Sequence, residues 1–363
     1  MFRIDRRLLQ NVDWPLLALT LALVVLGIIT LWALASARVG GGLVSRQLIW
    51  VGVGLVALVL VASVDYRSLV RGAPALYVVG LGLLVVVIVM GRTVSGARRW
   101  LPVGPVSLQP SELFKLIFIL TLVWAFTFRW AQPLSRGALW ASLGLLAVPS
   151  VLIIKQPDLG SALVLFPVLL ALLVGAGVPL RALGWLSLAS VAAGPVGWLF
   201  LKDYQRERIL IYLDPVRDPL GTAYNMIQSR IAIGSGQLLG KGVAGATQSR
   251  LAFLPERHTD FIFAVFAEMW GFLGCLLLLL CYGCLLLRGF EIAAIARDSP
   301  GRLIALGVTS LLAAQTIMNV AMVTGLLPVV GIPLPLMSYG GSSMVVTLMA
   351  VGLLLSVRMR QFG

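Results

Sequence analysis

The sequence predicts an all-α integral membrane protein with ten transmembrane helices, and three observations predict it. Sixty per cent of the 363 residues are apolar and 12% are charged, whereas a soluble domain is about half apolar and about a quarter charged. The mean hydropathy is +1.00. Long uncharged runs recur along the whole chain, and about 20 apolar residues cross a bilayer. A soluble enzyme and a disordered chain are therefore excluded.

The uncharged runs predict the spans in chain order. The first eight spans are predicted at residues 14–37, 47–64, 72–91, 116–128, 137–154, 159–180, 182–201 and 261–287. A polar stretch at 111–115 opens the fourth span, and Glu268 interrupts the eighth. Residues 303–357 carry no charge and are too long for one span. Prolines and glycines at 328–341 divide this run into the ninth and tenth spans.

One long polar segment, residues 202–259, lies between the seventh and eighth spans. We expect residues 1–363 to form a single polytopic membrane domain that includes this segment. Within it, residues 225–239 alternate apolar and polar residues in helical fashion, which predicts an amphipathic helix lying on the membrane. The glycine-rich stretch 234–242 lacks the glycine spacing of a phosphate-binding loop. The three cysteines share one apolar run and the chain has one histidine, so no zinc site is predicted.

The distribution of basic residues predicts the orientation. An even number of spans places both termini on one side, and that side carries thirteen Lys and Arg, against six in the short loops opposite. Basic residues favour the cytoplasmic side, so both termini are predicted in the cytoplasm and segment 202–259 outside. Because the basic residues lie singly between apolar runs, the net charge of +14 does not indicate nucleic-acid binding.

Ionisable groups are costly in a bilayer and therefore mark candidate functional positions. Glu112 and Lys115 open the fourth span, Asp158 the sixth and Asp260 the eighth, while the polar stretch 338–343 opens the tenth. Even-numbered spans all begin on the same side, so these groups are expected to converge at the external face.

Each of these residues also has a structural interpretation. Glu112 and Lys115 are three residues apart on one helix and can neutralise each other. Asp158, His258 and Asp260 can cap helix starts, and Trp100 can anchor the chain at the interface. Glu268 has no basic residue within a helical turn, so we expect it to pair across helices or to be neutral.

An external active site lacks nucleotide triphosphates, so a transferase there needs a donor that is already activated. Polyprenyl-pyrophosphate sugars are such donors and reach the site through the bilayer. A carboxylate can serve as the general base for an acceptor hydroxyl. Cationic side chains can stabilise the pyrophosphate leaving group, and the candidates are Arg98, Arg99, Lys115, Arg206, Arg208 and Arg257.

Six motifs together resemble the SEDS family of shape, elongation, division and sporulation proteins. They are Arg99-Trp100 and residues 109–115, 155–160, 228–236, 255–263 and 319–343. The resemblance implies a ten-span peptidoglycan glycosyltransferase that polymerises lipid II at the outer face of the bacterial cytoplasmic membrane. It implies Asp260 as the catalytic base. The predicted substrate-binding residues are Arg99, Trp100, Glu112, Lys115, Asp158, Arg257, His258, Tyr339 and Ser342.

The resemblance also implies the ligands and partners. These are lipid II, the growing lipid-linked glycan and a class B penicillin-binding protein that cross-links the glycan. No cofactor is established, and a divalent cation, Mg²⁺ or Mn²⁺, stays open as a companion of the pyrophosphate; no protein metal ligands are predicted. Gly271, Gly274 and Gly283 in run 261–287 allow close helix approach, so the partner's membrane anchor is predicted to dock there.

Two alternatives come from other functional classes. A lipid II flippase should carry polar groups through the full membrane depth, or a pair of broken helices at the midplane. The polar groups here lie mainly at one face, and Glu268 is the only deep ionisable residue. A non-enzymatic scaffold for the penicillin-binding protein leaves the convergence of acidic residues at one face unexplained.

Overall fold

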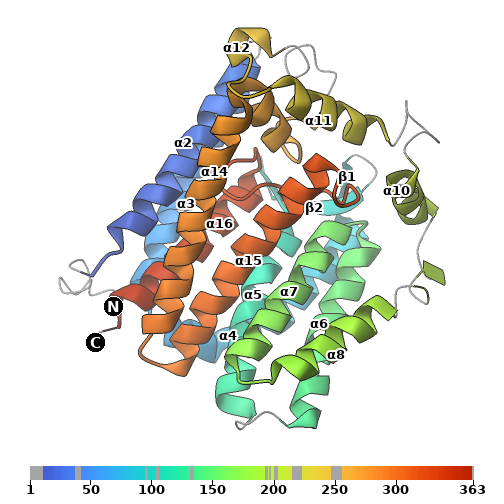
Figure 1. Ribbon diagram of the computed structural model, residues 1–363. Helices are drawn as coiled ribbons and strands as arrows, with labels where there is room; N and C mark the ends of the chain where they lie inside the picture. The colour runs from blue at the N-terminus through green and yellow to red at the C-terminus, as the bar shows by residue number, and fades with distance from the viewer. Residues whose placement is uncertain are drawn as a thin grey trace.

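The computed structural model describes most of the chain as a helical bundle (Figure 1). The described residues are 11–36, 42–94, 97–103, 106–130, 135–192, 195, 198–199, 203–214, 223–246 and 256–361. Arg3, Arg6, Arg7 and Arg38, which contribute to the predicted orientation, lie outside this set, as do parts of the predicted span 182–201 and of segment 202–259.

Eight helices among the described residues are long and apolar enough to cross a membrane. They are α2 (Trp14–Ser36), α3 (Gly42–Ser63), α4 (Tyr66–Met90), α5 (Pro110–Trp124) with the π-helical turn η1 (Ala125–Arg129), α6 (Arg136–Lys155), α14 (Ile262–Ile295), α15 (Ser299–Thr324) and α16 (Gly341–Met359). Two shorter apolar helices are α7 (Leu159–Gly175) and α8 (Leu180–Ala192). The helical membrane architecture is confirmed, with eight full-length candidate spans described instead of ten.

The boundaries follow local capping chemistry. The predicted division of 303–357 is confirmed, because α15 ends before Gly325, whose φ of 80° is left-handed, and α16 begins at Gly341. Helix α4 begins earlier than predicted: the Asp65 side chain accepts a hydrogen bond from the backbone N–H of Arg67. Arg67 also pairs with Asp298 at 2.7 Å. The sequence criterion missed this turn because it counted only uncharged residues.

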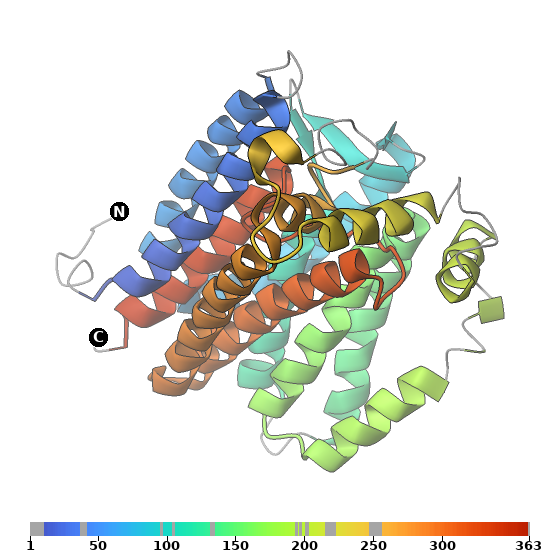
Figure 2. The same cartoon turned by 45° about the horizontal axis from the view of Figure 1, so that its top comes forward.

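Helices α5 and α16 are the most enclosed elements of the bundle. Helix α16 packs along α3, and α5 lies among α4, α7 and α15. Helix α14 packs between α2 and α15. The start of α2 and the end of α16 lie at the same end of the bundle, opposite α11 and α12 (Figures 1 and 2).

A small β-sheet occupies the region between α4 and α5, which the all-α prediction did not include. Strands β1 (Arg92–Val94), β2 (Ala97–Val103) and β3 (Val106–Leu108) form an antiparallel sheet in the order β1-β2-β3. Charged and apolar residues are interleaved here, so the uncharged-run criterion treated the region as a loop. Because side chains alternate along a strand, Arg98 and Arg99 project from opposite faces of β2.

The described parts of segment 202–259 contain three helices: α10 (Asp203–Leu213), α11 (Tyr224–Ser235) and α12 (Gly242–Gly245). Helix α11 confirms the predicted helix at 225–239, although its buried residues pack against α14 and α15 instead of resting on lipid alone. Ser229 fixes it by donating a hydrogen bond to the carbonyl of Val323 at 2.6 Å.

Helix α14 is interrupted at Gly271, where the chain leaves helical geometry with φ 64° and ψ −165°. The segment after α11 binds the interrupted turn. The backbone N–H groups of Phe272 and Leu273 donate to the carbonyls of Gln237 and Leu238 at 2.8 and 3.1 Å. The N–H of Lys241 donates to the carbonyl of Glu268 at 3.0 Å. Backbone groups freed by the break are thus satisfied within the chain.

The surroundings of the three glycines correct the predicted docking surface. A Cβ at Gly271 would lie 2.3 Å from the backbone nitrogen of Gly240, so the chain itself fills the space beside Gly271. A Cβ at Gly274 would contact Trp270 at 2.3 Å, whereas Gly283 has nothing within 4 Å. Gly271 is buried and is therefore removed from the predicted docking surface, whereas Gly274 and Gly283 are partly exposed and remain on it.

Gly271→Ala is expected to destabilise the fold strongly. A non-glycine residue in this backbone conformation costs about 1–3 kcal/mol, and the clash with the 238–240 backbone adds to it. Gly283→Ala is the matched control on the same helix, and it should be neutral or slightly stabilising. Thermal unfolding in detergent measures both. A melting temperature of Gly271→Ala at or above that of the parent would show that the 237–241 contact contributes nothing.

Candidate functional site

Asp260 lies at the connection that leads into α14, and the backbone around it is held by three hydrogen bonds. Tyr339 N–H donates to the carbonyl of His258 at 2.8 Å. Ser338 Oγ donates to the carbonyl of Thr259 at 2.7 Å. Asn319 Nδ2 donates to the carbonyl of Asp260 at 2.8 Å. Three consecutive carbonyls are therefore fixed by α15 and by the segment before α16.

The electrostatic surroundings of Asp260 suit a general base. Its side chain is partly buried. Burial is the largest cause that raises its pKa, the positive charges of Arg99 and Arg208 oppose the shift, and the negative charges of Glu256 and Asp158 add to it. The resulting pKa is about 6. No side-chain cap stabilises the start of α14, whose cap position is Phe261. The capping interpretation of Asp260 therefore has no support among the described contacts.

Arg208 and Arg99 act electrostatically on Asp260 from elements that are distant in sequence. Arg208 lies on α10 and donates from Nη1 to the carbonyl of Val329 at 3.3 Å. Tyr212, one turn further along α10, donates to the carbonyl of Leu326 at 2.8 Å. These two bonds attach α10 to the segment between α15 and α16. Arg99 lies on β2, and its buried Nε has no hydrogen-bond partner among the described residues.

Asp158 caps α7, as its structural interpretation predicted, and also joins two helices. It accepts from the backbone N–H of Ser161 at 3.2 Å. Its other oxygen accepts from Ser111 Oγ at 2.9 Å and from Gln109 Nε2 at 3.0 Å. The side chain is 2% exposed, so these bonds compensate its burial and connect the start of α5 to that of α7.

Glu112 and Lys115 form a buried ion pair within the first turns of α5. Lys115 Nζ lies 2.7 Å from Glu112 Oε1, and the two side chains are 2% and 3% exposed. Their predicted mutual neutralisation is confirmed. A role in substrate binding stays a prediction, which a double-mutant cycle of the pair would test.

The remaining predicted site residues are His258, Tyr339, Ser342, Trp100 and Arg257. Burial lowers the pKa of His258, and its ring meets that of Tyr339 edge-on at a centroid distance of 5.7 Å. Ser342 accepts from the N–H of Gln109 at 3.0 Å and is buried, so its hydroxyl is engaged within the chain. Trp100 lies on β2 beside Arg99, and Arg257 lies in the turn before α14, both partly buried.

Two further observations concern Glu268 and metals. Glu268 is fully buried in the first part of α14, where its carbonyl receives the bond from Lys241. Among the described residues, no three His, Cys, Asp or Glu side chains are grouped so that they could hold a metal ion. The cysteines are free thiols.

Asn319 is the positioning residue that sequence reasoning did not single out. It is fully buried, and its Nδ2 bridges the carbonyls of Asp260 and Ile332 at 2.8 and 2.7 Å. The available signal was a polar amide within the uncharged run 303–357.

Asn319→Leu is expected to lower both stability and activity. It leaves two carbonyls without their donor, at about 1–3 kcal/mol each, and it releases the backbone of Asp260. Thr316→Val is the control, since Thr316 bonds only within its own helix, to the carbonyl of Leu312. Chemical unfolding and glycan synthesis are measured for both variants. If Asn319→Leu unfolds like Thr316→Val, the bridge does not hold Asp260.

Relatives of known sequence cover nearly the whole chain. The profile of the FtsW/RodA/SpoVE family, described as cell cycle proteins, matches residues 10–362. Peptidoglycan glycosyltransferase MrdB of Escherichia coli K12 is 42% identical over 348 residues, which cover 96% of this chain and 93% of MrdB. Stage V sporulation protein E of Bacillus subtilis 168 is 37% identical over 354 residues, which cover 95% of this chain and 96% of that protein.

Solved structures show the same similarity. A chain of a peptidoglycan synthase complex that coordinates polymerization and crosslinking superposes with a TM-score of 0.82 at 37% identity, over 97% of this chain and 98% of that one. Rod shape determining protein RodA of Thermus thermophilus superposes with a TM-score of 0.74 at 32% identity, over 97% and 98% of the two chains. The fold, the motifs and these relatives together establish that the chain belongs to the FtsW/RodA/SpoVE family, the SEDS proteins.

Proposed function

We propose that this protein is a peptidoglycan glycosyltransferase that polymerises lipid II at the outer face of the bacterial cytoplasmic membrane during cell elongation. The observation that carries the proposal is the carboxylate of Asp260. The backbone of Asp260 is fixed by a hydrogen bond from Asn319 at one end of an apolar bundle. The pKa of its carboxyl group is raised to about 6, and the positive charges of Arg99 and Arg208 act on this group. Family membership supports the same reaction.

The proposed reaction is an inverting transfer. The carboxylate of Asp260 takes the proton from the 4-hydroxyl of the acceptor lipid II. The hydroxyl oxygen forms a bond to the anomeric carbon of the growing chain, and the bond from that carbon to the diphosphate oxygen breaks. Undecaprenyl diphosphate leaves with the bonding electrons, and Arg99 and Arg208 offset its negative charge.

The membrane arrangement is part of the proposal. The eight long helices together with α7 and α8 supply ten spans, with both termini in the cytoplasm and segment 202–259 outside. The proposed partner is a class B penicillin-binding protein, which cross-links the glycan. One assay separates the candidate functions. Purified protein, its partner and labelled lipid II in vesicles should give a glycan ladder, whereas a flippase gives translocation and a scaffold gives neither.

The pH dependence of synthesis is expected to follow the Asp260 carboxyl group. A general base works only when deprotonated. With the pKa raised to about 6, the initial rate should fall about tenfold per pH unit below that value and level off above it. Initial rates between pH 4.5 and 8, with unfolding monitored over the same range, test this. A flat profile for folded enzyme would contradict the role of Asp260.

A further inference from the structure

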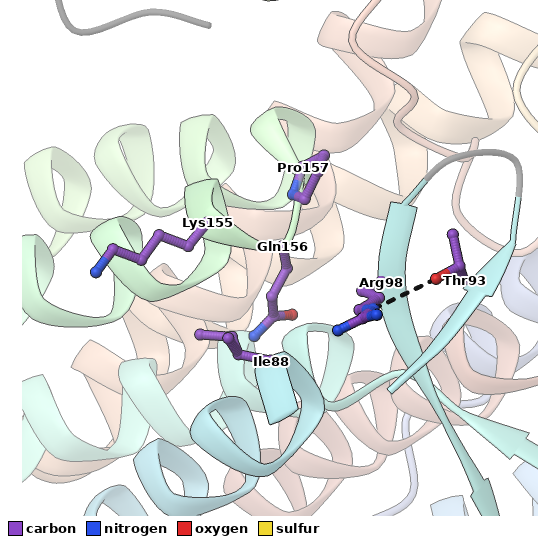
Figure 3. A pocket seen from close by; sticks show the side chains of 6 residues that line it. All are labelled: Ile88, Thr93, Arg98, Lys155, Gln156 and Pro157. Carbon is purple, nitrogen blue, oxygen red and sulfur yellow. Dashed lines mark hydrogen bonds between the residues drawn. The ribbon is translucent and has the colours of Figure 1, made fainter. Parts of the chain in front are cut away.

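A cleft separate from the hydrogen bonds around Asp260 lies where α4, the β-sheet and the junction of α6 and α7 meet. It has a volume of about 390 Å³ and is lined by Ile88, Thr93, Arg98, Lys155, Gln156 and Pro157. Figure 3 shows Arg98 on one side, Lys155 on the other and Gln156 between them. Arg98 and Gln156 face each other in the cleft, and the Lys155 side chain lies at its edge with its ammonium group directed away from Arg98.

The two cations have no anionic partner among the described contacts. Lys155 is the last residue of α6, and its side chain is exposed. Arg98 is exposed as well, and its Nε makes only a long hydrogen bond of 3.4 Å to Thr93 Oγ1. A cation at a helix end or at a membrane interface is common by itself. Arg98 in the cleft and Lys155 at its edge together make the local electrostatic potential positive, which favours an anion.

The amide of Gln156 supplies the second observation. The side chain is 1% exposed, and its Nε2 donates to the carbonyl of Leu84 at 2.9 Å. This bond fixes the orientation of the amide, because the flipped amide would place oxygen against oxygen. Oε1 has no donor among the described residues and is directed toward Arg98 (Figure 3). A buried acceptor without a donor costs free energy, so a ligand that donates a hydroxyl or N–H group to Gln156 Oε1 would be favoured.

The helices beside the cleft add an apolar surface. The final turns of α4 and α6 expose the side chains of Val85, Val89, Val148 and Val151. A ligand with an acyl or prenyl chain can lie on these side chains, with its head group beside Arg98 and Gln156 and with Lys155 at the edge of the cleft. An anion with a neighbouring hydrogen-bond donor and a long apolar chain is a membrane lipid with a phosphate head group.

We propose that this cleft is a binding site for the phosphate head group of a membrane lipid whose neighbouring hydroxyl or amide group bonds to Gln156. The expectation that the preferred occupant is a lipid-linked sugar rests on the proposed function. Transfer between two lipid-linked chains requires two head-group sites, and Arg98 and Arg99 project from opposite faces of β2. Arg99 acts at the Asp260 site, and Arg98 serves the second site.

The test counts bound lipids without turnover. Delipidated full-length protein carrying Asp260→Asn, which removes the proposed base, is titrated with lipid II or with phosphatidylglycerol and analysed by native mass spectrometry. Arg98→Gln with Lys155→Gln removes both cations of the cleft. Arg46→Gln with Lys241→Gln is the matched control, since both side chains are exposed and the change in charge is the same.

The double cleft variant is expected to lose one class of bound lipid, with affinity reduced at least about tenfold, because each charge-assisted hydrogen bond contributes strongly; the control keeps it. Loss of lipid II alone identifies the lipid-linked sugar as occupant, and an equal loss of phosphatidylglycerol identifies a general phospholipid site. Equal binding by cleft and control variants overturns the proposal. If the parent enzyme makes no glycan, the proposed function is wrong, but the lipid-binding measurement can still be interpreted.

Discussion

Asp260→Asn is expected to abolish glycan synthesis without lowering the melting temperature at pH 8. The amide keeps the size of the side chain but cannot accept the proton, and loss of a general base costs about 10²–10⁴ in rate. The three backbone hydrogen bonds at residues 258–260 use carbonyl groups, so the substitution leaves them in place.

The stability prediction follows from the sign of the pKa shift. The pKa of Asp260 in the folded protein, about 6, lies above its ordinary value of 3.8. The folded state therefore binds this proton more tightly than the unfolded state, and the free energy of unfolding decreases as the pH rises from about 4 to about 6. Asparagine removes that penalty, so the variant at pH 8 should be as stable as the parent or more stable.

Asp214→Asn is the control, since it is the same substitution at an exposed carboxylate on the segment that follows α10. It should retain activity. Glycan ladders with the partner present, together with thermal unfolding, measure both variants. Near-parental synthesis by Asp260→Asn would remove Asp260 as the base, and a lower melting temperature would mean that its carboxylate is structural.

Lys115→Met is expected to lower the free energy of unfolding by about 3–5 kcal/mol, because it leaves the buried carboxylate of Glu112 without its partner. The double variant with Glu112→Met should recover most of that stability, since replacing both members of a buried pair by apolar residues is often neutral. The recovery isolates the interaction energy of the pair.

Activity separates the two interpretations of this pair. If Glu112 and Lys115 only neutralise each other, the double variant regains activity together with stability. If Lys115 binds the diphosphate, as a cation near the membrane interface can, the double variant is stable and inactive. Chemical unfolding and glycan synthesis on the same preparations give both quantities. A stable and fully active double variant would contradict a substrate-binding role.

Several parts of the site could be predicted from sequence because their signals are local. Asp158 follows proline at the start of an apolar run, which is typical of a helix cap, and the structure places it there. Glu112 and Lys115 are three residues apart on one helix, so their pairing follows from helical geometry. The division of 303–357 follows from its prolines and glycines.

The partners of Asp260 could not be predicted in this way. Asn319 and Ser338 are 59 and 79 residues from the groups that they bond, and nothing in the local pattern specifies those contacts. The break in α14 is similar, because the apolar run continues through Gly271 while segment 237–241 supplies the missing hydrogen bonds.

The sequence by itself determined the membrane character of the chain, most of its spans, the long segment 202–259 and the candidate acid Asp260. These follow from the free energy of transferring each segment into lipid, which depends on composition along about 20 residues. Tertiary structure decided the β-sheet, the packing of α11 and the hydrogen bond from Asn319 to the backbone of Asp260. Those features depend on which backbone and side-chain groups meet across the fold, because buried polar groups require partners that can lie anywhere along the chain.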